Sequence, residues 1–201
     1  GPFILRRMKS DVLKELPPKT ENVYRIELEE EQRKLYLAAV VDAREKLQAA
    51  KPEDKMAVFA VLMRLREICC DPRLIADNWE GGSTKLDACV ELVSSAVEGG
   101  HRILLFSQFT SMLELLAKRL DAEGISHFTL QGSTPKPVRA ELVRRFNGGE
   151  VSVFLISLRA GGTGLNLTAA DIVIHYDPWW NVAAQNQATD RAYRIGQQNP
   201  V

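Results

Sequence analysis

Apolar and polar residues repeat with two different periods along the chain, and the change falls at Gly81–Gly82. Before this point apolar residues recur at helical spacing over residues 29–50 and 54–70, which predicts two amphipathic helices. Ahead of them, the prolines in Leu16–Lys19 indicate an extended lead-in, and Val23–Ile26 indicates a short strand. The first part of the chain is therefore predicted to be a helical unit with an extended entry.

After Gly82 short apolar runs alternate with segments of helical period. Thr84 with Asp87, and Ser111 with Glu114, resemble the capping boxes that begin helices. Strands are predicted at 102–106, 125–130, 151–156 and 172–176, and helices from 84, from 111, over 138–146 and in the arginine-bearing segment around 190. This alternation predicts an α/β fold, in which helices cover both faces of a parallel sheet.

Polar loops follow each predicted strand. They begin at Ser107-Gln108, at Gln131–Thr134, at Ser157 and at Asp177. Because ligands of open α/β sheets bind at the carboxyl ends of the strands, these hydroxyls, amides and backbone N–H groups would suit phosphate contacts along one rim. Any one of them is also an ordinary turn residue that needs no functional explanation.

The loop after the third predicted strand is rich in glycine. It runs from Ser157 to Leu167 and contains Gly161, Gly162 and Gly164, which would let backbone approach a ligand closely. A dinucleotide-binding fingerprint is the competing interpretation. That match fails, since a leucine stands where the third glycine should fall.

Near the C-terminus, Gln187, Arg191 and Arg194 are spaced to share one face of a helix. A separate stripe of alanines at 184, 188 and 192 would lie against the sheet. Paired guanidiniums can hold a phosphoryl group bidentately and stabilise charge that develops on it. The alternative is a solvated basic face with surface ion pairs.

Composition adds little to this picture. The 201 residues carry 26 basic and 26 acidic side chains, so net charge does not by itself indicate nucleic-acid binding. The spacing of the three cysteines and three histidines predicts neither a disulfide nor a metal site, and buried free thiols are expected. No apolar run approaches membrane-spanning length, which indicates an intracellular protein without a membrane partner.

In combination, the motifs FSQ at 106–108, QGST at 131–134, SLRAGGTGLNL at 157–167, WWN at 179–181 and QATDRAYRIGQ at 187–197 are specific. They resemble the second RecA-like lobe of Swi/Snf-type superfamily two ATPases, with details closer to bacterial members. By this resemblance, residues 1–20 would be the junction from a first lobe, 21–82 a helical protrusion, and 83–201 the second RecA-like lobe without its final strand and brace. Val182 departs from the proline usual after Trp-Asn.

The resemblance implies a motor that uses ATP with Mg²⁺ to move along double-stranded DNA, in the cytoplasm or nucleoid of a bacterium or the nucleus of a eukaryote. Arg194 would be the arginine finger and Arg191 a second γ-phosphate contact, with Gln187 also facing the nucleotide. Gly162, Thr163 and Gly164 would couple nucleotide to DNA. The implied DNA contacts are Ser107, Gly132, Ser133, Thr134, Arg159, Asn166 and Trp180.

The chain contains no Gly-x-x-x-x-Gly-Lys-Ser/Thr motif and no acidic pair that ends a strand. The phosphate cradle and the Mg²⁺ ligands are therefore expected on the first lobe of the same polypeptide, and this chain alone is expected to be inactive. Two alternatives stay open, an RNA helicase lobe and a RecA-like binding module without turnover.

Overall fold

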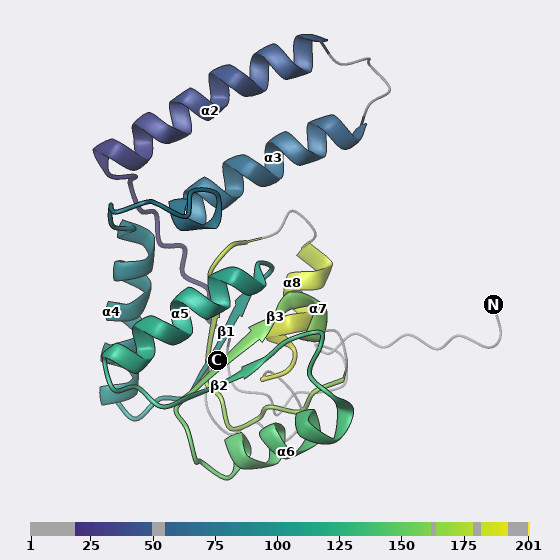
Figure 1. Cartoon of the computed structure of the whole chain (residues 1–201). Helices are drawn as coiled ribbons and strands as arrows, with labels where there is room; N and C mark the ends of the chain where they lie inside the picture. Colours follow the sequence, from purple (N-terminus) through teal and green to yellow (C-terminus); the bar gives the residue numbers. More distant parts are fainter. Residues whose placement is uncertain (1–18, 50–54, 162–163, 179–181, 193–200) are drawn as a thin grey trace, which may run out of the picture.

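The computed structural model describes residues 19–49, 55–161, 164–178, 182–192 and 201. Two long helices, α2 (Glu30–Ala49) and α3 (Lys55–Cys70), lie side by side and project from the rest of the molecule (Figure 1). A short 3₁₀ turn, η1 (Pro72–Leu74), follows them. The two predicted helices are confirmed to within one residue at the ends that the structure describes.

Within the described residues, four strands form one sheet in the order β2-β3-β1-β4, and every pair is parallel. The elements after residue 83 are α4 (Thr84–Glu98), β1 (Ile103–Ser107), α5 (Thr110–Ala122), β2 (His127–Leu130), α6 (Lys136–Asn147), β3 (Val153–Ser157), α7 (Leu158–Gly161), β4 (Ile172–His175) and α8 (Val182–Thr189). All carboxyl ends of the strands therefore meet at one edge. The predicted α/β fold is confirmed.

The two faces of the sheet carry separate hydrophobic cores. Because side chains alternate along a strand, Leu105 joins one core and its neighbour Leu104 joins the other. Helices α4 and α5 cover the first face, where Leu116 is fully buried, and α6, α7 and α8 cover the second, where Phe146 is fully buried (Figure 1). Helices on both faces hold the central strands in a fixed position.

Two helix starts differ from the predicted capping boxes. Helix α4 is capped by Ser83, one residue earlier than expected, whose hydroxyl accepts from Leu86 N at 3.4 Å. Helix α5 has Phe109 at its N-cap without a side-chain cap, so Ser111 lies inside the helix and caps nothing. The motif Ser/Thr-x-x-Asp/Glu alone did not distinguish a cap from the first turn.

The strand predicted at Val23–Ile26 is wrong. The structure gives this segment no regular secondary structure, and Val23 and Tyr24 are 84% and 69% exposed. Backbone pairing, which a strand requires, is not recorded for it within the described residues. Its apolar pattern therefore does not reflect burial in this structure.

The cysteine prediction holds for two positions. Cys70 and Cys89 are buried free thiols, and burial raises the pKa of each to about 12. Cys69 is half-buried. Among the helices of the described part, none is long and apolar enough to cross a membrane.

Backbone at the end of α3 joins the helical pair to the sheet-bearing lobe. The carbonyl of Cys70 accepts hydrogen bonds from Tyr176 Oη at 2.9 Å and from Ser83 Oγ at 3.2 Å. Within the pair, the buried Gln32 side chain donates to Ile68 O at 2.7 Å. The two bonds to Cys70 O hold the pair at the end of the sheet where the carboxyl ends of the strands meet, and the Gln32 bond joins the two helices to each other.

Candidate functional site

The rim begins at the end of β1, where Ser107 is fully buried. Its hydroxyl accepts from Phe109 N at 3.1 Å and shapes the turn into α5. The hydroxyl of Ser107 therefore binds within its own loop, and the expected position of Ser107 near a DNA backbone stays a prediction. The neighbouring Gln108 is half-buried and faces the end of β4.

The loops after β1 and β4 are tied together through Asp177. Its buried carboxylate accepts from Gln108 N at 3.1 and 3.2 Å, and burial raises its pKa to about 6. Arg66 reaches across from α3 and donates to Pro178 O at 2.8 Å. The helical pair thus contacts the segment that leads to Trp180, which itself lies outside the described residues.

A hollow of about 330 Å³ lies at this junction. Apolar side chains from α3, among them Leu62 and Leu65, form one wall, and Pro178 closes another side. Lys85 lines it as well and lies 4.8 Å from the ring centroid of Tyr176. The hollow lies between the helical pair and the rim, and Arg66 spans it from α3 to Pro178 O.

The loop after β2 is a closed turn. Thr134 N donates to Gln131 O at 3.1 Å, and Gln131 N donates to Thr134 Oγ1 at 3.0 Å. Gly132 and Ser133 at its tip are exposed. A Cβ added at Gly132 would meet nothing within 4 Å, so the space above this backbone is open to a ligand.

The loop after β3 carries several predicted residues. Arg159 on α7 and Asn166 are exposed, and Gly164 adopts a φ of +65°. Gly162 and Thr163 lie outside the described residues. Asn147, at the end of α6, donates from Nδ2 to Asn166 O at 2.9 Å. This bond holds the backbone of Asn166 against the lobe, while the Asn166 residue stays exposed.

The predicted arginine face is wrong as a single helical face. Helix α8 ends at Thr189, and Arg191 lies in the turn that follows, only 7% exposed, while Gln187 on the helix is exposed. Ala188 and Ala192 are buried against the sheet as expected, and a continued helix is replaced by turn bonds such as Ala192 N to Thr189 O at 3.1 Å. Arg194 lies outside the described residues.

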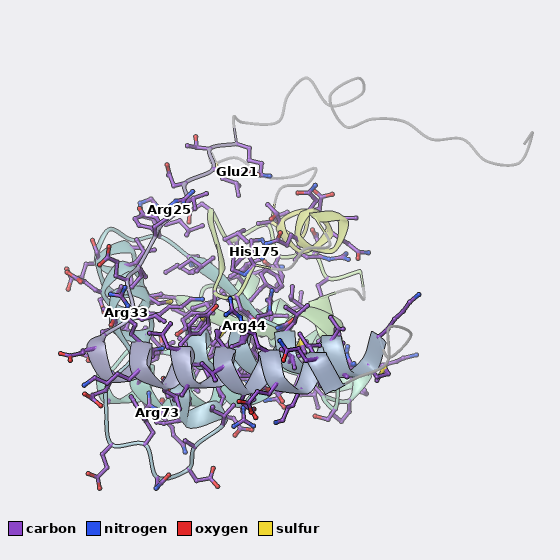
Figure 2. The ribbon with its side chains drawn as sticks, turned by 90° about the horizontal axis from the view of Figure 1, so that it is seen from above. Glu21, Arg25, Arg33, Arg44, Arg73 and His175 are labelled. Atoms are coloured by element: carbon purple, nitrogen blue, oxygen red, sulfur yellow. The ribbon has the colours of Figure 1, made fainter. Side chains whose placement is uncertain are left out.

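This turn touches the glycine-rich segment directly. Arg191 O accepts from Leu167 N at 3.0 Å. Nearby, His175 at the end of β4 stacks on Phe106 with ring centroids 5.6 Å apart, and burial lowers its pKa. Figure 2 labels His175 together with Glu21 and Arg25 of the extended entry segment; Glu21 lies close enough to His175 to influence that pKa.

Three residues that shape the rim were not predicted as site residues. They are Arg66, Asn147 and Arg139, whose guanidinium donates to loop carbonyls after β2. Arg66 gave a signal, because it interrupts an apolar stripe of α3 that contains Leu62 and Cys69. The other two look like ordinary surface residues of a polar helix.

Family comparisons agree with this arrangement. The pattern of the helicase conserved C-terminal domain matches residues 84–196, and that of the SNF2-related domain matches residues 1–74. This chain belongs to the SNF2-type helicases. The RecA-like fold expected from the motifs is confirmed by the parallel sheet and by likeness to the C-terminal lobes of SNF2 ATPases.

Individual relatives cover the whole chain. An uncharacterized ATP-dependent helicase of Mycoplasma genitalium is 39% identical over 206 residues, which are 100% of this chain and 20% of that protein. The mouse SWI/SNF-related regulator of chromatin, subfamily A member 1, is 39% identical over 214 residues, again 100% of this chain and 20% of that protein. This SNF2-type chain thus spans about a fifth of these relatives.

A solved structure gives the same result. The SWI2/SNF2 ATPase core of Sulfolobus solfataricus in complex with dsDNA superimposes with a TM-score of 0.79 at 31% identity. The match covers 100% of this chain and 43% of that one. The helical pair and the SNF2-type lobe are therefore both present in a protein of this family solved on DNA.

Proposed function

We propose that this chain is the C-terminal motor lobe of an ATP-dependent double-stranded DNA translocase. The observation that carries the proposal is the single rim where the loops after β1, β2, β3 and β4 meet, all at the carboxyl ends of parallel strands. A structural relative at 31% identity was solved with dsDNA, which supports the same ligand here.

On the DNA side, the proposal uses the exposed loop tips. Gly132 and Ser133, with the half-buried Thr134, form one tip, and Arg159 and Asn166 come from the segment after β3. Backbone N–H groups, hydroxyls and a guanidinium suit phosphate oxygens, which carry no sequence information. We therefore expect binding that weakens with salt and varies little with DNA sequence. Trp180 is proposed as a groove contact.

On the nucleotide side, the proposal assigns Arg194 as the arginine finger and Arg191 as a second γ-phosphate contact, with Gln187 and the segment 162–164 beside them. Guanidinium groups suit the charge that develops during phosphoryl transfer. Because Arg191 is 7% exposed, its contact with nucleotide requires the turn after α8 to rearrange. The bond from Leu167 N to Arg191 O joins this turn to the DNA-facing segment.

ATP with Mg²⁺ would bind between this lobe and a first RecA-like lobe of the same polypeptide. In the part of the chain that the structure describes, no group of three His, Cys, Asp or Glu side chains is arranged to hold a metal ion. The proposal assigns the Mg²⁺ ligands to the first lobe because the sequence lacks the Gly-x-x-x-x-Gly-Lys-Ser/Thr motif and the acidic pair. The present chain, as the second lobe, would contribute the guanidiniums of Arg191 and Arg194, which suit the phosphoryl oxygens as donors.

The test uses the full-length protein with two DNA substrates. Triplex displacement reports movement along duplex DNA, and a forked duplex reports strand separation. We expect ATP-dependent triplex displacement without fork unwinding, and Arg194→Ala should reduce turnover by roughly 10³ to 10⁵ while ATP still binds. Arg194→Lys should restore little, because an ammonium lacks the planar fork.

Other outcomes would replace the proposal. Efficient unwinding of a forked RNA would favour an RNA helicase lobe, and tight DNA binding without ATP turnover would favour a binding module. Trp180→Ala should reduce triplex displacement more than basal ATP hydrolysis; unchanged displacement would remove Trp180 from the site.

A further inference from the structure

Arg139, in the first turn of α6, binds back to the loop that precedes its own helix. Its Nε donates to Thr134 O at 2.7 Å, and one terminal nitrogen donates to Gly132 O at 2.7 Å and to Gln131 O at 3.3 Å. One guanidinium therefore collects three carbonyls from a four-residue turn. Only a planar fork with several donors can do this, and a lysine ammonium cannot reproduce the geometry.

The carbonyls of Gln131, Gly132 and Thr134 are consequently occupied, which leaves, among the described residues of this turn, only that of Ser133 without a bond from Arg139. Within the described residues, no hydrogen bond is recorded from the N–H groups of Gly132 and Ser133, and both residues are exposed. The remaining polarity at the tip is thus donor-rich. This is the polarity that a phosphate oxygen requires, and the open space at the Cβ position of Gly132 admits it.

The other arginines of α6 behave differently. Arg144 pairs with Glu141 at 2.7 Å, and Arg145 pairs with Glu150, all on the exposed surface. Such pairs contribute little to stability. Arg139 alone among the three binds the loop, which makes Arg144 a matched control on the same helix.

We propose that Arg139 is a positioning residue, which holds residues 131–134 in the shape that grips the DNA backbone. This inference rests on the proposed function, because it deepens the role of the same loop. It assigns Arg139 no phosphate contact of its own. The loop donors touch the DNA, and Arg139 acts through them.

The experiment compares full-length wild-type protein with Arg139→Gln, Arg139→Lys and the control Arg144→Gln. Amide hydrogen exchange of a peptide spanning 131–134, measured without DNA, reports how firmly Arg139 orders this loop, an effect called the clamp below. The DNA concentration that gives half-maximal ATPase stimulation, and its dependence on salt, reports how tightly the protein binds DNA. Unchanged exchange in α5 confirms that each variant is folded.

We expect both Arg139 variants to speed exchange in this peptide at least about fivefold, because three hydrogen bonds are weakened or lost. The half-maximal DNA concentration should rise about tenfold, since the loop must now be ordered on binding, while the ATPase rate at saturating DNA stays close to wild type. The slope of log affinity against log salt should not change. Arg144→Gln should match wild type.

Three results would overturn the inference. A salt slope reduced by about 0.9, with rescue by Arg139→Lys, would make Arg139 a direct phosphate contact. Faster exchange with an unchanged half-maximal DNA concentration would show that Arg139 orders the loop but that this order has no role in DNA binding. Wild-type protein whose ATPase does not respond to DNA at all would remove the proposed function itself, an outcome that the exchange data keep separate from failure of the clamp.

Discussion

The buried carboxyl of Asp177 should make the stability of this chain fall as pH rises through the weakly acidic range. Burial raises its pKa from 3.8 to about 6, against the opposing effect of the hydrogen bond from Gln108 N. Between these values the folded chain binds more protons than the unfolded chain, so the stabilising contribution is full below about pH 4 and lost above about pH 6. A shift of about two units corresponds to about 3 kcal/mol.

The perturbation is Asp177→Asn, which keeps an oxygen acceptor for Gln108 N and removes the titration. Urea denaturation of both chains from pH 4 to pH 7 gives the difference in free energy of unfolding, wild type minus variant. We expect this difference to fall by up to about 3 kcal/mol as pH rises. Asp77→Asn, in an exposed turn, controls for the loss of one carboxylate.

The sign of the pH effect decides the outcome. A difference that stays flat would mean that Asp177 titrates alike in the folded and unfolded chains. A difference that rises with pH would mean that Arg66 and Lys85 stabilise the ionised form more than burial opposes it, which reverses the physical reasoning.

Three further outcomes are expected. Leu116→Ala should destabilise the chain by about 2–5 kcal/mol in urea denaturation, because Leu116 is fully buried between α5 and the sheet; a loss below about 1 kcal/mol would contradict this packing. Gly132→Ala should weaken DNA binding several-fold at unchanged stability, since its Cβ meets no protein atom but would obstruct a close-lying phosphate; equal affinity in a titration with duplex DNA would exclude close approach there. The isolated 201-residue chain should not hydrolyse ATP, because it lacks a P-loop sequence, and hydrolysis that survives the Arg194→Ala control for contaminants would refute this.

The fold could be predicted from sequence because periodicity reports burial directly. The first four positions of β1, Ile103–Phe106, are all apolar, as a strand covered on both faces requires. The same rule failed at Val23–Ile26, where apolar residues lie exposed. A pattern of side chains shows which residues could be buried, whereas strand formation also needs a neighbouring backbone to pair with.

The site was predicted less completely, for a reason visible at Arg191. Helical spacing placed it beside Gln187 and Arg194, but packing of Ala192 and the bond from Leu167 end the helix earlier and turn Arg191 inward. Helix ends depend on tertiary contacts that local sequence does not encode. Arg139 was missed for the converse reason, because its role depends on backbone carbonyls, which every residue has.

The hydrogen bond from Leu167 N to Arg191 O limits how strongly DNA and nucleotide can change each other's affinity through this contact. If DNA binds one side of it and nucleotide the other, each must alter the affinity for its counterpart by the same factor, whichever binds first. A net contribution of about 0.5–1.5 kcal/mol for one hydrogen bond supports a factor of only about 2 to 13. A larger measured factor would require rigid-body movement between lobes to supply most of the coupling free energy. This bond would then only fix the segment of Leu167 relative to the turn of Arg191.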